Sequence, residues 1–389
     1  MKIFLNLLAA TAGGQISRAR AFLDRFDNFS NNAQLIVIKE KSALVEYRST
    51  DRRMVIDIPI GHGRLKALRR MWWENFVMPG VIHRHGADVY LTFSHYLPHL
   101  KDIGVPTVVG VSNLAPFSSE AWRHESLPVK LKMAALRQTI LSSVRRATTV
   151  LALSETCREV LVEQGITRDK IVVTPNGVDT YWSQSAPSTD LLSRLGIVRP
   201  YLLYVSHFHR YKNYARLVEA YALLPTVLQS AHQLVLVGKP QNKLYYEQIQ
   251  MLIKQLGLSD TVILIPGESS ESLKELYQNT KLFVFPSLIE NSPNILLEAM
   301  MAGAPVAASS LSPMPEFCGT ASEYFDALDV SSMASKIEKL LGDTKHLIDL
   351  SEQSHSQACK FTWDDFVSDV IEYVELANDN SKGVVNVDI

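Results

Sequence analysis

Short apolar runs, often β-branched, alternate along most of this chain with stretches whose apolar residues recur at helical spacing. In the first half the apolar runs lie at residues 2–9, 34–38, 54–60, 88–93, 106–111, 149–153 and 171–174. In the second half they lie at 201–206, 233–238, 261–265, 281–285 and 305–308, and the main amphipathic stretches at 16–27, 128–146, 155–164, 212–224, 243–256, 270–279 and 293–302. Apolar strands alternating with helices predict parallel sheets that are covered on both faces.

The alternation begins a second time after the segment Asn176-Gly177-Val178-Asp179. A polar stretch, SQSAPSTD, follows, and a new apolar run starts at Tyr201. We therefore expect an α/β protein with two doubly wound, Rossmann-like domains, at 1–185 and 195–360. In such sheets ligands bind beyond the carboxyl ends of the strands, so we expect a cleft where the two domains face each other.

Composition and charge narrow the possible functions. The chain has 389 residues and 47% apolar residues, which suits two domains with sizeable cores. Residues 1–190 carry 24 Lys and Arg against 17 Asp and Glu, whereas residues 191–389 carry 15 against 23. The basic half suits an anionic partner. The three cysteines form neither a disulfide framework nor a metal motif, which favours the reducing cytoplasm. We interpret the apolar start of the chain as a buried strand rather than a signal peptide.

The segment FPSLIENSPNILLEAMMAGAPV carries the clearest chemical signal. An apolar strand runs into Glu290, and a helix follows with Ser292 expected as N-cap and Pro293 as first helical residue. Glu298 is expected to point out from the second turn. A helix amino end between two carboxylates favours a phosphate with sugar hydroxyls on either side, as in a nucleotide-sugar. The alternative is a buried crossover helix with two incidental glutamates.

Two further loops are expected to approach an anion. The sequence SHFHRYKN follows the first strand of the second half and puts Lys212, with Arg210 nearby, where a cation would neutralise a diphosphate. Near the start, Gly13 and Gly14 would let backbone N–H groups approach a phosphate. The alternatives are a solvated lysine in a first helical turn and an ordinary tight turn; the glycine pair falls short of a dinucleotide motif.

Metal and nucleic-acid sites are not expected. The pairs His83/His85 and His207/His209 would share a face if they lay on strands, but no acidic or cysteine partner stands at a recognisable spacing. We therefore expect no metal and no cofactor. The near-zero net charge and the lack of a recognisable binding module argue against nucleic acid.

Residues 62–85 combine five Lys and Arg with Trp72, Trp73 and Phe76. This composition suits a segment that lies on an anionic membrane surface. An amphipathic helix whose tryptophans pack in the core fits equally well. Both interpretations stay open from the sequence alone.

Taken together, the segments AGGQISRA, NGVD, YVSHFHRYKN, FPSLIENSPNILLEAMMAGAPVAAS and SPMPEFCG resemble the family-4 retaining glycosyltransferases. That resemblance implies the GT-B fold, with the acceptor bound mainly by the first domain and the nucleoside diphosphate sugar by the second. It also implies that a last helix at about 362–377 packs back on the first domain.

The resemblance further implies roles for individual residues. Glu298 would hold the ribose hydroxyls, Glu290 would lie near the donor sugar, and Lys212 would bind the diphosphate. The implied set is Glu290, Lys212 and Asn113 for catalysis, and Gly13, Gly14, Arg210, Lys212, Asn291, Ser292, Asn294 and Glu298 for donor binding. Asn113 enters because Ser112-Asn113 stands where many members have a His-Asp pair. Ser206-His207 replaces the usual Gly-Arg, so Arg210 is expected to substitute.

The expected function is thus transfer of a sugar, with retention, to a glycan or lipid-linked glycan precursor in bacterial surface polysaccharide synthesis. We expect a cytoplasmic enzyme, peripheral on the inner face of the membrane. A nucleotide-sugar epimerase on the same fold, or a non-catalytic nucleotide-sugar-binding subunit, are the alternatives.

Overall fold

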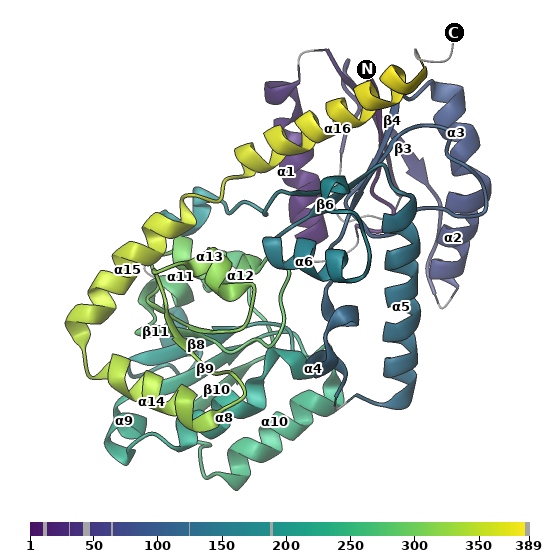
Figure 1. Ribbon diagram of the computed structural model, residues 1–389. Coiled ribbons are helices and arrows are strands. Elements are labelled where there is room, and N and C mark those ends of the chain that lie inside the picture. The colour runs from purple at the N-terminus through teal and green to yellow at the C-terminus, as the bar shows by residue number, and fades with distance from the viewer. Residues whose placement is uncertain are drawn as a thin grey trace. The chain divides into compact units, whose positions relative to one another are not determined.

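The computed structural model describes residues 1–10, 14–30, 32–41, 47–63, 65–123, 125–186 and 190–385 (Figure 1). Its backbone divides into two compact units. Unit 1 comprises Met1–Phe117, Leu127–Gly177 and Trp363–Ile389, and unit 2 comprises Ser118–Ser126 and Val178–Thr362.

Unit 1 is built on a parallel seven-stranded sheet of order β3-β2-β1-β4-β5-β6-β7. The strands are β1 (Lys2–Asn6), β2 (Gln34–Glu40), β3 (Arg53–Ile58), β4 (Val89–Thr92), β5 (Thr107–Gly110), β6 (Thr149–Ala152) and β7 (Ile171–Val173). Its helices are α1 (Gly14–Phe29), α2 (Lys66–Phe76), α3 (Met78–His85), α5 (Leu127–Arg146), α6 (Glu155–Glu163) and α16 (Trp363–Val385), with short 3₁₀ turns η1 (Ala115–Phe117) and η2 (Arg168–Lys170).

The last helix, α16, is part of the core of unit 1 although it comes from the far end of the chain. It packs against α1, and an ion pair of 2.8 Å joins Arg25 Nε to Asp364 Oδ1 at their contact. Phe366 of α16 packs against Phe93 with the two rings tilted, and Phe93 in turn contacts Phe22 edge to face. These aromatic contacts bury the apolar face of α16 against a sheet whose strands are apolar on both faces.

Unit 2 contains a parallel six-stranded sheet of order β10-β9-β8-β11-β12-β13. Its strands are β8 (Tyr201–Val205), β9 (Gln233–Val237), β10 (Val262–Ile265), β11 (Leu282–Phe285), β12 (Val306–Ser309) and β13 (Glu323–Phe325). Its helices are α4 (Ser119–Trp122), α7 (Leu191–Arg194), α8 (Tyr214–Ala222), α9 (Thr226–Ala231), α10 (Lys243–Gln255), α11 (Ser270–Asn279), α12 (Asn294–Met301), α13 (Met314–Cys318), α14 (Val330–Leu341) and α15 (Thr344–Ala358), with 3₁₀ turns η3 (Thr180–Ser183) and η4 (Arg210–Lys212).

Every strand predicted from the apolar runs is present, and the fold class is confirmed as two parallel α/β sheets. The edge strand β13 was missed because it has only three residues, begins with Glu323 and lacks a continuous apolar run. Segment 62–85, left open above, forms two successive helices, α2 and α3.

In each sheet the strand order reverses at one position. In unit 1 the reversal lies between β1 and β4, and in unit 2 it lies between β8 and β11. At such a reversal the connections leave in opposite directions, which opens a crevice beyond the carboxyl ends of the two strands. The residues that follow these four strands are therefore the strongest candidates for a ligand-binding or catalytic site.

A close backbone approach fixes the start of the loop that follows β8. A β-carbon on Gly238, directly after β9, would lie 1.6 Å from the carbonyl oxygen of Ser206. That same oxygen accepts a hydrogen bond of 2.5 Å from the Tyr214 hydroxyl. The position thus requires glycine, and the loop is held from its first residue.

Candidate functional site

Two loops meet at the reversal in unit 2, since β8 and β11 are parallel neighbours. The first, 206–213, follows β8, and the second, 286–293, follows β11. The Leu288 N–H donates to the Tyr211 carbonyl at 2.9 Å, and the Asn213 side-chain amide donates to the Pro286 carbonyl at 3.1 Å. These bonds fasten the two loops to each other.

A buried ion pair connects the tips of these loops. Lys212 Nζ lies 2.5 Å from Glu290 Oε1, and the two side chains are only 13% and 12% exposed. Burial lowers the pKa of Lys212, but the attraction of Glu290 outweighs this effect and the pKa ends above its ordinary value. The site therefore holds a firmly protonated lysine at neutral pH.

The sequence had suggested that Lys212 opens a helix, and this expectation is wrong. Lys212 ends the 3₁₀ turn η4, and helix α8 begins two residues later at Tyr214. The residue between them, Asn213, has a left-handed backbone with φ 63°. Its amide, which also donates to the Ala327 carbonyl at 2.7 Å, supplies the contacts that hold this conformation.

Helix α12 also begins later than predicted. Its first residue is Asn294 and its N-cap is Pro293, so the assignments of Ser292 as N-cap and Pro293 as first helical residue are wrong. Pro293 has ψ 76°, which is not helical, and its carbonyl accepts from the N–H groups of Leu296 and Leu297. Asn291 is buried in the preceding loop, whereas Ser292 and Asn294 are half-buried at the helix amino end.

Arg210 is turned toward helix α10. Its guanidinium donates to Gln248 Oε1 at 2.7 Å and lies 5.2 Å from the centre of the Tyr245 ring. Among the described residues, Lys212 thus has an acidic partner and Arg210 has none.

Glu298, in the second turn of α12, is half-buried rather than exposed. Burial, followed by the negative charge of Asp179, raises the pKa of Glu298 to about 8, while the Tyr277 hydroxyl opposes that shift. Asp179 comes from the NGVD segment, so two acidic groups distant in sequence lie near enough for their charges to interact. Near neutral pH this carboxyl group is mostly protonated and can donate a hydrogen bond.

Three of the predicted residues belong to unit 1. Gly13 lies outside the described residues, and Gly14 is the first residue of α1. Asn113 follows β5, and its side-chain oxygen accepts a 2.9 Å bond from the Ala115 N–H. Its neighbour Ser112 donates to the Phe93 carbonyl at 2.7 Å.

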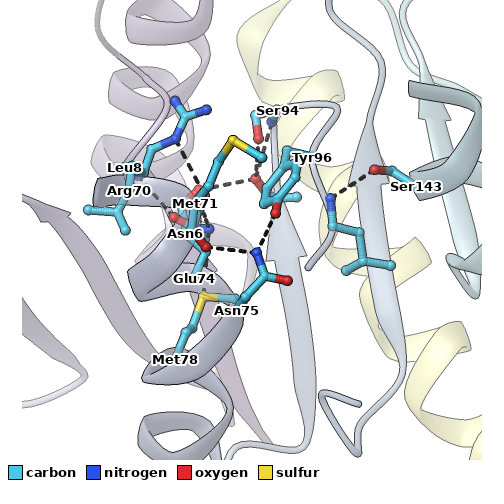
Figure 2. A network of polar contacts seen from close by, with 12 residues as sticks. Asn6, Leu8, Arg70, Met71, Glu74, Asn75, Met78, Ser94, Tyr96 and Ser143 are labelled. Atoms are coloured by element: carbon cyan, nitrogen blue, oxygen red, sulfur yellow. Dashed lines mark hydrogen bonds and ion pairs between the residues drawn. The ribbon is translucent and has the colours of Figure 1, made fainter. Parts of the chain in front are cut away.

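Sequence reasoning missed a buried polar network beyond β1 and β4 of unit 1 (Figure 2). The Asn6 amide donates to Glu74 Oε1 and to the Tyr90 hydroxyl, both at 2.9 Å, and Glu74 is also 3.4 Å from Arg70 Nε. Burial raises the pKa of Glu74. The sequence signal that could have found this network is Asn6, a polar residue that ends an otherwise apolar run at the edge of the sheet that borders the crevice.

Among the residues that the structure describes, no three His, Cys, Asp or Glu side chains gather as a metal site would require. His83 and His85 lie in the last turn of helix α3, where alternate residues do not share a face. Within the same described ranges, no helix has the length and apolar character needed to cross a bilayer.

Two family models match the chain. The one described as "Glycosyl transferases group 1" covers residues 195–357, and the one described as "Glycosyltransferase Family 4" covers residues 33–182. Together they span both units.

The chain is similar to individual proteins of the same kind. It is 29% identical over 229 residues to the serotype-specific mannosyltransferase WbdA of Escherichia coli, a match that covers 57% of this chain and 28% of that relative. The chain thus matches little more than a quarter of that longer protein. It is 24% identical over 293 residues to the O-antigen chain mannosyltransferase B of Escherichia coli, covering 74% of each. The solved structure of Anabaena Alr3699/HepE in complex with UDP-glucose superposes with a TM-score of 0.72 at 17% identity, covering 96% of this chain and 99% of that one.

Glu298 should make stability depend on pH. Because its pKa is raised on folding, the folded protein binds more protons than the unfolded chain between pH of roughly 4.5 and 8, so its contribution to stability falls as pH rises through that window. We expect E298Q to lose this dependence and, at pH of about 9, to have a free energy of unfolding higher than that of wild type by up to about 4 kcal/mol, and therefore a higher Tm. Thermal unfolding from pH 5 to 9 measures the effect, with exposed Glu247→Gln on α10 as the matched control. Parallel curves for wild type and E298Q would contradict it.

Proposed function

We propose that this chain, which belongs to the glycosyltransferases of group 1 and Family 4 and has the GT-B fold, transfers a sugar from a nucleoside diphosphate sugar to a hydroxyl of an acceptor glycan, with retention at the anomeric carbon. The bond between the anomeric carbon and the phosphate oxygen breaks, a bond to the acceptor oxygen forms, and the acceptor proton leaves with the diphosphate.

The buried Lys212–Glu290 pair beside the amino end of α12 is the observation that carries this proposal. A leaving diphosphate gains negative charge as its bond to the sugar breaks, so a fixed cation and the positive end of a helix dipole stabilise it. Glu290 keeps Lys212 charged and positioned before the donor arrives. Each such donor contributes about 3 kcal/mol to transition-state stabilisation in other enzymes.

Glu298 would contact the ribose hydroxyls of the donor. Its carboxyl group, with a pKa of about 8, both donates and accepts hydrogen bonds near neutral pH, which suits a pair of hydroxyl groups. Asn291, Ser292 and Asn294 would supply polar contacts at the amino end of α12. Gly13, Gly14 and Arg210 are kept as candidate donor contacts, and Asn113 as a candidate catalytic residue.

The relatives support a surface glycan as the acceptor. One of them is named a serotype-specific mannosyltransferase and another an O-antigen chain mannosyltransferase. We therefore propose mannose as the first donor sugar to test and a lipid-linked glycan precursor as the acceptor class.

An apolar stripe on helix α2 favours a peripheral membrane contact at the cytoplasmic face. Leu65, just before the helix, is 59% exposed, and Leu68, Trp72 and Phe76 on it are 62%, 59% and 44% exposed. The sequence alternative in which both tryptophans pack in the core is therefore wrong for Trp72. Exposed Arg69 adds positive charge beside the stripe, as an anionic bilayer surface requires.

Replacing Lys212 should lower turnover. We expect K212M to lower kcat by about a hundredfold or more, because the leaving diphosphate loses its fixed cation. The exposed lysine of α10, changed as Lys254→Met, removes the same charge from the same unit and should leave kcat within about twofold. Turnover is measured with purified full-length protein, GDP-mannose or another nucleotide-sugar, and a glycan acceptor.

Analysis of the wild-type product by NMR tests the stereochemistry. Retention of the anomeric configuration is expected, and an inverted linkage would refute that part of the proposal. Conversion of the donor without any acceptor would favour an epimerase. Donor binding without turnover of any acceptor would favour a non-catalytic subunit.

The stripe on α2 should govern sedimentation with vesicles. We expect W72A and F76A each to reduce the fraction that sediments with vesicles of phosphatidylglycerol by at least about threefold, since each removes a large exposed apolar side chain. Leu244→Ala in unit 2, where Leu244 is 71% exposed, is the matched control and should sediment like wild type. Equal sedimentation of all four proteins would exclude α2 as the contact.

A further inference from the structure

Arg18 is a buried cation for which the described residues provide no acidic partner. It stands in the second turn of α1 and is only 3% exposed. Its one hydrogen bond within these residues runs from Nε to the Gly14 carbonyl at 3.2 Å, which leaves the two terminal nitrogens of the guanidinium without a described acceptor. Burial lowers the pKa of Arg18 to about 10, so it stays charged at neutral pH. An enclosed charge without a counter-ion is strongly unfavourable and is kept only where something else offsets it.

His95 lies within electrostatic reach of both Arg18 and Arg70. His95 follows β4, and the charges of Arg70 and Arg18 add to burial in lowering its pKa to about 4. It is therefore a neutral imidazole. Its Nδ1 is buried and has no hydrogen-bond partner among the described residues.

Arg70, on helix α2, acts on the same imidazole, and its side chain is 26% exposed. Its partner Glu74 lies 3.4 Å away and is fully buried. Because Glu74 balances Arg70, the cluster retains one net positive charge, that of Arg18. The cluster lies beyond β1 and β4, at the reversal of strand order in unit 1, where ligands bind in sheets of this type.

We propose that Arg18, with Arg70 and His95 beside it, binds an anionic group, and that this group is the phosphate or pyrophosphate of the acceptor. The inference rests on the proposed function, because it assigns the acceptor of that reaction a chemical class. Lys212 of unit 2 is the cation that the proposed function assigns to the donor diphosphate, and Arg18 of unit 1 is assigned to a second phosphate. A guanidinium whose two terminal nitrogens have no acceptor among the described residues matches phosphate oxygens in geometry as well as charge.

The test compares two arginines of one helix in full-length protein. Arg18 is buried and Arg20 is exposed, so Arg18→Gln and Arg20→Gln remove the same charge from different environments. Calorimetric titration with inorganic pyrophosphate should give an affinity at least about tenfold weaker for R18Q and within about twofold of wild type for R20Q. Equal affinity in all three proteins, or no binding to wild type at millimolar pyrophosphate, overturns the proposal.

Thermal unfolding distinguishes ligand binding from a structural role. R18Q removes an unbalanced buried charge, so its Tm should equal or exceed that of wild type while pyrophosphate affinity falls. A lower Tm with unchanged pyrophosphate affinity means that Arg18 only supports the fold. R18K keeps the charge and should recover part of the affinity.

Nucleoside diphosphates separate the acceptor site from the donor site. R18Q should bind UDP and GDP like wild type, whereas K212M should lose that binding and keep its pyrophosphate site. If R18Q weakens nucleoside diphosphates as much as pyrophosphate, Arg18 serves the donor and the proposal is wrong. If K212M keeps full nucleoside diphosphate affinity, the proposed donor role of Lys212 fails while the result at Arg18 stands.

Farnesyl pyrophosphate identifies the source of the phosphate. Binding that depends on Arg18 and is at least about tenfold tighter than that of inorganic pyrophosphate indicates a lipid-linked acceptor. Equal, Arg18-dependent affinities indicate a soluble sugar phosphate. Both results support the site, and farnesyl pyrophosphate binding that ignores Arg18 contradicts it.

Discussion

The ion pair between Lys212 and Glu290 belongs both to the proposed chemistry of unit 2 and to its fold. Two charged side chains that are nearly enclosed stabilise each other only while their separation stays short. Their loops are attached to neighbouring strands and joined by backbone hydrogen bonds, so the sheet itself holds that separation. Removing either partner would leave the other as an isolated buried charge, which makes both residues part of the fold as well as of the proposed site.

Unit 1 presents the opposite arrangement at the equivalent place. There the buried cation, Arg18, has no described carboxylate, whereas Lys212 has one. A cation that already has a carboxylate partner gives up part of that ion pair when an anionic ligand binds. A cation without such a partner gains an ion pair that it did not have before. The first arrangement favours a site preorganised for a reaction step, and the second favours a site whose occupancy adds to stability.

The pattern of apolar residues determined much of the fold, because parallel strands buried on both faces are distinct in any sequence. It also placed Lys212 and Glu290 at one edge, since both follow strands of one sheet. It did not reveal their ion pair, because the register of side chains in two irregular loops depends on contacts such as those of Asn213. The start of α12 was misplaced for a related reason: a proline suits the N-cap and the first helical position alike, and only the backbone angle distinguishes them.

The burial of Arg18 could have been predicted from the sequence, whereas its lack of a described acidic partner could not. The pair Arg18 and Arg20 looks like two ordinary surface residues, yet Arg18 shares a helical face with Phe22 and Phe26, four and eight positions later. Both phenylalanines are fully buried. That spacing was a usable signal for an enclosed arginine, whereas the absence of a counter-ion depends on which side chains the rest of the fold brings near.

The close approach of Gly238 to the Ser206 carbonyl limits how this protein can diversify. Since even a methyl group is excluded there, the strand and the beginning of the adjoining loop are effectively one rigid piece. At the proposed donor site, sequence change that alters nucleotide recognition is therefore expected farther along this loop or in the loop after β11. Directed libraries that spare Gly238 and Ser206 and vary residues from 207 onward should retain far more folded members than libraries that include them.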